Sequence, residues 1–223
     1  MHQQIEPPIL YLGTPVVLIS TINPDGSPNI SPMSSAWWLG WSCMLGLDAS
    51  SQTTLNLLRT GECVLNLPSA SEVAHVDRLA RKTASDPMPP HKVAMGWEIE
   101  RDKFGRAGLT PQASLDVAPP RAAECPVQLE AHLIDDHPFA ESDPRIGIAM
   151  RAIEVRITRV HADPKLLSQT HADRFEPDAW NPLLMSFLQF YARGANIHPS
   201  YLAELPQEAW AGRKPRRLGG VGG

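Results

Sequence analysis

The chain has 223 residues, of which 43% are hydrophobic and 20% charged, so it is long and apolar enough to bury a sizeable core. Its formal charge of -4 offers no overall attraction to nucleic acid or to an anionic membrane, and the composition excludes disordered, fibrous and collagen-like chains. The 22 prolines and the aromatic share of 6% favour short strands and loops over long helices.

The amino-terminal residues and the cysteines indicate the cellular compartment in which the protein is expected. The amino terminus is polar where a secretory signal needs a basic patch and an apolar run, and no window approaches 18 apolar residues. We therefore expect a cytoplasmic protein with no membrane-spanning helix. The three cysteines, at positions 43, 63 and 125, are odd in number and widely spaced, so we expect buried free thiols and neither a disulfide framework nor a zinc site.

The first third of the chain predicts strands separated by turns and short helices. Strands are expected over residues 15–23, 29–35, 41–47 and 62–67, the first two forming a hairpin around the turn signal at 24–27. The hydroxyls at 50–53 suit the capping of a helix over 53–59, which Gly61 ends. Apolar residues at helical spacing predict a further helix over 69–81.

The remainder predicts a long loop, two strands and a late helix. Prolines interrupt all periodicity from Thr83 to Gly96, which predicts a loop of a length that is often functional. Strands are expected over 127–134 and 146–160. Asn181 and Pro182 are typical of a helix start, and predict a helix over 183–193.

These elements predict a mainly β fold, an antiparallel barrel with a few peripheral helices and a C-terminal helix. Residues 1–165 are expected to form the barrel. Residues 166–223 are expected to form a helical extension and a flexible tail of the same domain, with the basic run at 213–217 exposed to solvent.

Familiar catalytic signatures are missing. The sequence holds no G-x-S-x-G, H-E-x-x-H, Walker or G-x-G-x-x-G motif, so neither a serine hydrolase nor a Rossmann cofactor site is supported, and we assign no catalytic residue. His132 and His137 flank two aspartates, but on a strand they point to opposite faces, and Asp135–Pro138 is good turn chemistry. We expect no metal site there.

Small hydroxyl residues gather after the first hairpin and at the first helix start: Ser31, Ser34, Ser35, Ser50, Ser51, Thr53 and Thr54. A helix N-terminus offers unpaired N–H groups and a positive dipole end, which suit a phosphate. Ordinary capping needs only one of these hydroxyls. The cluster alone therefore leaves two alternatives open, simple capping and an anion site.

Several short motifs follow one another in a distinctive order. The chain reads DGSPNISPMS at 25–34, SQTTLN at 51–56 and GECVLNLP at 61–68, and further on DKF at 102–104, GLTP at 108–111 and ECPV at 124–127. In this order the motifs resemble those of the flavin reductase-like family of FMN-binding split barrels, which includes flavoredoxin-like flavoproteins. The similarity covers roughly residues 10–165.

The resemblance implies a split β-barrel that dimerises, with FMN in a groove near the subunit interface. The backbone of Met33, Ser34 and Ser35 would run along the isoalloxazine edge, with N–H groups serving N5 and O4. The phosphate and ribityl chain would be held by Ser50, Ser51, Gln52, Thr53 and Asn56. Asn66 and Leu67 would border the ring or the ribityl chain, and Lys103 would add a cation near the phosphate.

One departure from the family concerns the phosphate. The family commonly has Lys-Asp or Lys-Tyr where this chain has Ser51-Gln52, so a charge-assisted contact is absent. Either another cation, such as Lys103 or Arg81, substitutes for it, or FMN binds more weakly and behaves as an exchangeable substrate.

The resemblance implies a flavin oxidoreductase that transfers hydride from NADH or NADPH to FMN, without a Rossmann site. Two alternatives are an FMN-dependent reductase of an organic acceptor, such as a nitroaromatic or quinone, and a non-catalytic electron carrier. The expected partners are a second copy and either a small acceptor or a flavin-dependent monooxygenase, with neither nucleic acid nor membrane involved. Trp37 or Trp38, the 83–96 loop and the 183–193 helix are candidates to wall or cover the pocket.

Overall fold

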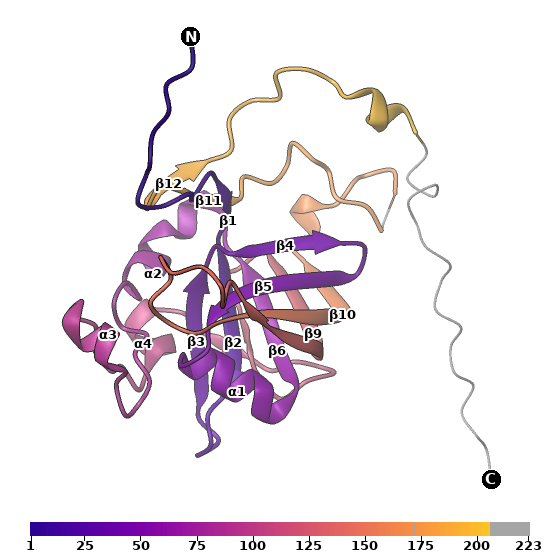
Figure 1. The fold of residues 1–223 in the computed structure, drawn as a ribbon. Helices are drawn as coiled ribbons and strands as arrows, with labels where there is room; N and C mark the ends of the chain where they lie inside the picture. Colours follow the sequence, from indigo (N-terminus) through magenta and orange to yellow (C-terminus); the bar gives the residue numbers. More distant parts are fainter. Residues whose placement is uncertain (172, 206–223) are drawn as a thin grey trace. The chain divides into compact units, whose positions relative to one another are not determined.

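The computed structural model describes residues 1–171 and 173–205. The chain divides into two units, Met1–Arg193 and Gly194–Gly223. The first is mainly β (Figure 1), and the described part of the second contains a short 3-10 helix, η3 (Tyr201–Glu204). The boundary expected after residue 165 stays a prediction, and the basic run at 213–217 lies outside the described residues.

The centre of the first unit is a seven-stranded antiparallel sheet in the order β3-β2-β6-β9-β10-β5-β4. Its members are β2 (Val17–Ile22), β3 (Pro28–Met33), β4 (Ala36–Leu39), β5 (Ser42–Asp48), β6 (Glu62–Leu67), β9 (Val127–Phe139) and β10 (Met150–Ala162). The two edge strands, β3 and β4, are consecutive in the chain and are joined only by Ser34 and Ser35. Such a short connection holds the two edges close together, so the sheet curls into a split barrel.

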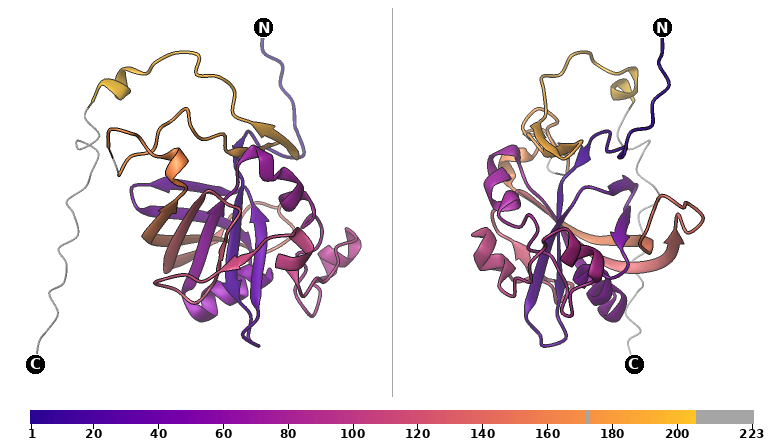
Figure 2. Two further views of the ribbon diagram at one scale, coloured as in Figure 1. Left: turned by 180° about the vertical axis from the view of Figure 1, so that it is seen from behind. Right: turned by 60° about the vertical axis from the view of Figure 1, so that its left-hand side comes forward.

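Strand β2 is buried on both of its faces. Val17 and Ile19 join an apolar cluster with β5, β6, β9 and β10, the inner apolar cluster, whereas Leu18, with Val16 just before the strand, joins a second cluster on the opposite side. Helices α2 (Val73–Asp77) and α4 (Lys103–Ala107) pack against that second cluster, and Figures 1 and 2 show them beside β2 and β3. Burial on both sides explains why the strand reads as a continuous apolar run.

The helix expected over 53–59 is confirmed as α1 (Gln52–Thr60). The Ser51 side chain accepts a hydrogen bond from the Thr54 N–H at 3.2 Å, as an N-cap should. Gly61, at φ 73°, ends the helix in the left-handed conformation and donates its N–H to Leu57 at 2.8 Å. The chain then enters β6 at once, as predicted.

The helix expected over 183–193 is wrong. The segment forms a hairpin of β11 (Leu183–Ser186) and β12 (Gln189–Ala192), and β11 also pairs with β1 (Thr14–Pro15). Phe187 and Leu188 make the turn at φ 44° and 63°, the signs of a type I′ turn. Leu184 and Tyr191, which a helix places on one face, are direct cross-strand partners here, so the same apolar spacing satisfies both structures.

Three smaller expectations also change. The helix predicted over 69–81 breaks into the 3-10 turn η1 (Ala70–Glu72), then α2 and turns, and the loop predicted over 83–96 contains the short helix α3 (Pro90–Ala94). The turn predicted at Asp135–Pro138 is wrong, because these residues continue β9 and pair with β10. A register shift beside Ile134 lets the pairing continue there.

The remaining elements are β7 (Pro111–Gln112), β8 (Arg121–Ala122) and η2 (Pro164–Leu166).

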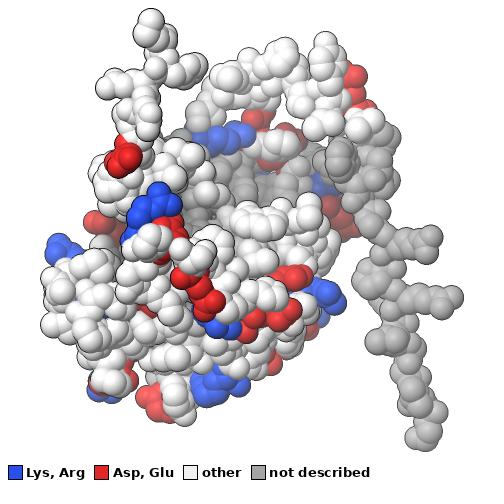
Figure 3. All heavy atoms as spheres, in the orientation of Figure 1, with Lys and Arg blue, Asp and Glu red and all other residues white. Residues whose placement is uncertain are grey.

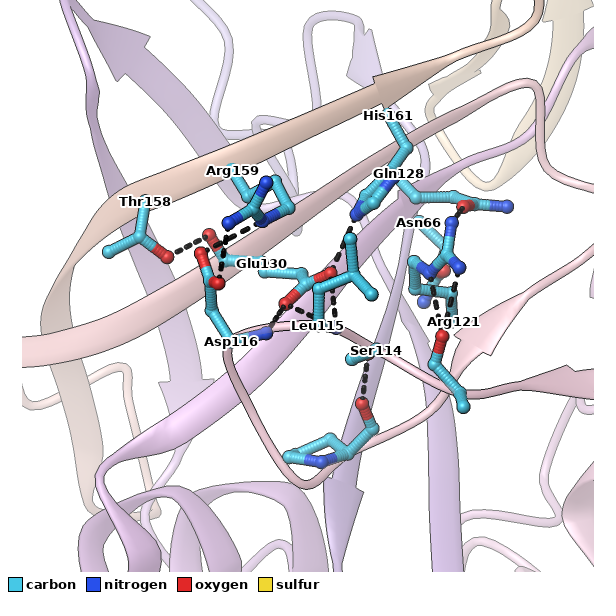
Figure 4. A network of polar contacts seen from close by, with 12 residues as sticks. Asn66, Ser114, Leu115, Asp116, Arg121, Gln128, Glu130, Thr158, Arg159 and His161 are labelled. Atoms are coloured by element: carbon cyan, nitrogen blue, oxygen red, sulfur yellow. Dashed lines mark hydrogen bonds and ion pairs between the residues drawn. The ribbon is translucent and has the colours of Figure 1, made fainter.

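A buried carboxylate fixes the segment between β7 and β8 (Figure 4). Glu130 of β9 is fully buried and accepts hydrogen bonds from the N–H groups of Leu115 at 3.0 Å and Asp116 at 2.6 Å. His161 Nε2 lies 2.6 Å from Glu130 Oε1. Burial alone would raise the pKa of Glu130, but these bonds outweigh it and hold the pKa below its ordinary value.

The Glu130→Gln variant should lower the free energy of unfolding at pH 7 by about 1–3 kcal/mol, because the charged acceptor of several buried bonds is lost. A lowered native pKa stabilises the fold above the unfolded-state pKa, and this stabilisation disappears as pH falls through the native value. The difference between the two proteins in urea unfolding should therefore narrow below about pH 4.3. Exposed Glu141→Gln is the control, and equal stability of Glu130→Gln and wild type at pH 7 would contradict the assignment.

Candidate functional site

The segment Met33–Ser35 lies at the split of the barrel. The Ser35 carbonyl accepts a hydrogen bond from the Gly46 N–H at 2.7 Å, and a Cβ added at Gly46 would lie 3.1 Å from the Ser35 Cβ. Glycine at position 46 thus permits a close approach of the two backbones. Ser50 lies four residues beyond Gly46, at most about 14 Å away along the chain. The split and the hydroxyl cluster are therefore neighbouring parts of one region.

The hydroxyl cluster is largely occupied by local bonds. Ser50 donates both its N–H and its hydroxyl to Asp48 Oδ1, at 2.8 and 2.7 Å, and Ser51 caps α1. Thr53 is buried, and its hydroxyl accepts a hydrogen bond from Asn29 Nδ2 at 3.2 Å. Of these hydroxyls, only that of Ser51 is needed to cap α1. The first N–H groups of a helix have no partner within the helix, so they stay free to bind a ligand.

Lys103 brings a buried positive charge to this helix. The side chain is 4% exposed, and its Nζ donates to Asn29 Oδ1 at 2.5 Å, through the same asparagine that reaches Thr53. Within the described residues Lys103 makes no ion pair with a carboxylate. Burial, together with the charge of Lys92, lowers the pKa of Lys103 to about 8, although the charge of Glu100 acts in the opposite direction. A buried ammonium of this kind favours the arrival of an anion.

Lys103 opens onto a cavity of about 440 Å³ beside α1. Gln52 and Asn56 also line it, so the structure brings three of the predicted site residues together there. Their amides form a chain, since Gln52 Nε2 donates to Asn56 Oδ1 at 2.8 Å and Asn56 Nδ2 donates to Asn23 Oδ1 at 2.9 Å. Charged side chains of both signs complete the wall, namely Arg59, Arg101, Asp25, Asp86 and Glu100.

The segment 83–96 packs onto the turn that precedes α1. Ser85 donates its hydroxyl to the Ser50 carbonyl at 3.0 Å, while His91 Nε2 and Lys92 Nζ lie 3.0 and 3.7 Å from Asp48 Oδ2. Burial would raise the pKa of Asp48, but the bonds from Ser50 and His91 and the charge of Lys92 lower it. The loop therefore carries two basic side chains to the hydroxyl cluster, which the sequence did not assign to the site.

Other predicted residues lie elsewhere. Asn66 is fully buried, where its Nδ2 donates to the Leu18 carbonyl at 3.0 Å and its Oδ1 accepts from the Ala122 N–H at 2.8 Å. Leu67 belongs to the inner apolar cluster. Neither lines the cavity beside Lys103. Arg81, the other suggested cation, is exposed, and its carbonyl accepts from the Glu98 N–H at 2.7 Å.

The two tryptophans that follow the split have different surroundings. Trp37 is 57% exposed, whereas Trp38 packs against the inner apolar cluster, as neighbours on a strand should. The Trp38 indole nitrogen is buried and has no hydrogen-bond partner in the described part of the chain.

The curled antiparallel sheet defines a split-barrel domain. A polar turn and two buried lysines lie beside the split, and such groups suit an anionic ligand. The Flavin reductase like domain matches residues 10–183. The uncharacterized protein YdfE of Bacillus subtilis (strain 168) is 34% identical over 203 residues, which cover 91% of this chain and 94% of that protein. The chain therefore belongs to the flavin reductase-like family, and its function is that of a flavin-related oxidoreductase.

Solved structures share the fold. Flavoredoxin of Desulfovibrio vulgaris (Miyazaki F) is 21% identical at a TM-score of 0.69, covering 92% of this chain and 100% of its own. Nitrilotriacetate monooxygenase component B from Bacillus cereus is 19% identical at a TM-score of 0.67, covering 84% and 88%. The 2-nitrobenzoate 2-nitroreductase NbaA of Pseudomonas fluorescens is 16% identical at 0.64, covering 86% and 87%. Among the described residues, no helix has the length and apolar character needed to cross a membrane.

The Lys103→Met variant should raise the free energy of unfolding of the ligand-free protein at pH 7, on the order of 1 kcal/mol, because a buried charge is removed and only the bond to Asn29 is lost. The native pKa is lowered, so the wild-type penalty is full below about pH 8 and disappears as pH rises towards the unfolded value. Denaturant unfolding at pH 7 and pH 10 measures both effects. Exposed Lys165→Met should change neither value, and a gain for Lys103→Met that is the same at both pH values would refute the assignment.

Proposed function

We propose that the protein is an NAD(P)H-dependent flavin oxidoreductase that uses FMN. The observation that carries the proposal is Lys103, a buried cation without a carboxylate partner among the described residues, set beside the first turn of α1 in a flavin reductase-like barrel. The residues present fit FMN, because its phosphate monoester would pair with the buried ammonium of Lys103, which has no ion-pair partner within the described residues. Bound flavin supplies a hydride acceptor, and the protein's own groups supply position and dipoles.

The phosphate end is assigned to the turn at the start of α1. Lys103 holds the phosphate by charge, and the first-turn N–H groups at Gln52 and Thr53 orient it. Ser50 and Ser51 shape the turn through their bonds to Asp48 and to the helix. Polar groups on Gln52 and Asn56 then line the path of the ribityl hydroxyls.

The ring end is assigned to the split. Backbone N–H groups of Met33–Ser35 orient the isoalloxazine edge, and Ser35 is held in place by its bond from Gly46. Leu67 and Asn66 support this end from β6: Leu67 belongs to the apolar cluster against which Met33 packs, and Asn66 donates to the Leu18 carbonyl of the neighbouring strand. No side chain has to move a proton for hydride transfer to flavin, which agrees with the absence of an assigned catalytic residue.

A homodimer belongs to the same proposal, with FMN near the subunit interface. The edge hairpin of β4 and β5 exposes three large apolar side chains, Trp37 at 57%, Leu39 at 77% and Trp41 at 62%. This apolar row lies directly after Met33–Ser35, so a second copy seated on it would border the ring end. A contiguous apolar row on an edge strand is typical of a surface that pairs with another chain.

The electron acceptor and the location are also proposals. A small organic acceptor or a flavin-dependent monooxygenase would take the electrons in the cytoplasm; one structural neighbour is named as component B of a monooxygenase. Acidic and basic side chains are interspersed on the face shown in Figure 3, which supports neither a nucleic acid nor a membrane as partner.

The enzymatic proposal is tested by nicotinamide oxidation. Purified protein with FMN should oxidise NADH or NADPH faster than free FMN does, as followed by the loss of nicotinamide absorbance. Lys103→Met should raise the FMN concentration needed for half-maximal rate about ten- to a hundredfold, and Lys165→Met should not. Added quinone or nitroaromatic compounds separate acceptor reduction from flavin reduction. If FMN binds but neither nicotinamide reduces it, the electron-carrier alternative holds instead.

The dimer is tested by Leu39→Glu. A charge placed in the apolar row should convert a dimer to a monomer in sedimentation velocity, because it would be buried without a partner at the interface. Leu10→Glu, at a residue 69% exposed elsewhere on the chain, should leave the dimer intact. A monomeric wild type, or a dimeric Leu39→Glu, would show that the β4–β5 hairpin is not the interface.

A further inference from the structure

Lys92 is the buried lysine that the sequence left unassigned. It lies in α3, within the proline-rich segment, and is 7% exposed. Its ammonium lies 3.4 Å from the Thr83 carbonyl and 3.7 Å from Asp48 Oδ2. The second distance exceeds that of a short charged hydrogen bond, so Asp48 only loosely engages Lys92.

Asp48 is already engaged by other groups. Ser50 donates twice to its Oδ1, and His91 Nε2 lies 3.0 Å from its Oδ2. Lys92 thus shares this carboxylate with Ser50 and His91, and its charge is close enough to Lys103 to help lower the pKa of Lys103. Two neighbouring buried ammonium groups attract a phosphate monoester.

The position of Lys92 can make up for the lysine that the family commonly has at position 51 and that this chain lacks. A family lysine at that position would extend from the start of α1, whereas this chain brings a lysine from the separate segment 83–96 to the same turn. Ser85 ties that segment to the Ser50 carbonyl at 3.0 Å, so the lysine and the hydroxyl turn are fixed to each other.

We propose that Lys92 supplies the phosphate-binding cation that replaces the family lysine at Ser51, so that segment 83–96 closes over the phosphate of FMN. The inference rests on the proposed function, because it takes FMN as the ligand. It assigns a binding role to Lys92 and makes the loop a clamp whose order depends on the phosphate. His91 is a positioning residue, which keeps Asp48 in place while Lys92 turns to the ligand.

The test compares FMN with riboflavin, which has the same ring and ribityl chain and no phosphate. Dissociation constants are measured by quenching of flavin fluorescence. Lys92→Ala should weaken FMN binding about ten- to a hundredfold and leave riboflavin binding unchanged, and Lys92→Arg should restore part of the loss. Lys82→Ala is the matched control, since Lys82 pairs with Glu98 in the adjoining segment and should bind both flavins as wild type does.

A second readout follows the loop directly. FMN, but not riboflavin, should protect the amides of residues 83–96 from hydrogen exchange in wild type, and this protection should be lost in Lys92→Ala. Equal weakening of FMN and riboflavin by Lys92→Ala, or no weakening of either, would overturn the inference while leaving the proposed function standing. Wild-type protein that binds neither flavin would instead overturn the proposed function. Thermal unfolding of each variant shows that folding is intact.

Discussion

The two-residue link between the edge strands is the constraint on which the rest of the domain depends. Ser34 and Ser35 must join β3 to β4 across the open side of a seven-stranded sheet, so the sheet has to curl. Curling buries the inner apolar cluster and brings Ser35 against Gly46. It also places the backbone of Met33–Ser35 beside the strand that leads to the hydroxyl turn. The same link thus organises both the core and the proposed ring site.

The fold could be predicted from the sequence where local and tertiary signals agree. The cap at Ser51 and the left-handed Gly61 mark α1 by chemistry that acts within a few residues. The helix predicted over 183–193 was wrong because there the local signal does not decide between two structures. Its apolar spacing fits a helix and a hairpin equally well, and the choice depends on pairing with β1, which lies far away in the chain. Local pattern cannot report such a partner.

The candidate site was predictable in its residue types but not in its assembly. Motif order located Ser50, Ser51 and Lys103, yet the bond between Lys103 and Asn29 joins residues 74 positions apart. Asp48 and Lys92 had no motif of their own, and only the proximity of the 83–96 segment to the hydroxyl turn identifies them. A basic pair, His91 and Lys92, inside an unusually long proline-rich loop was the one sequence signal available.

The buried charge of Lys103 has a consequence for the stability of the protein in the cell. A buried charge lowers the free energy of unfolding while the site is empty. Ligand that binds only the folded state raises this free energy by mass action. Under the proposed function, the supply of flavin would set how much of the protein escapes degradation. Abundance would follow cofactor availability without any dedicated regulator.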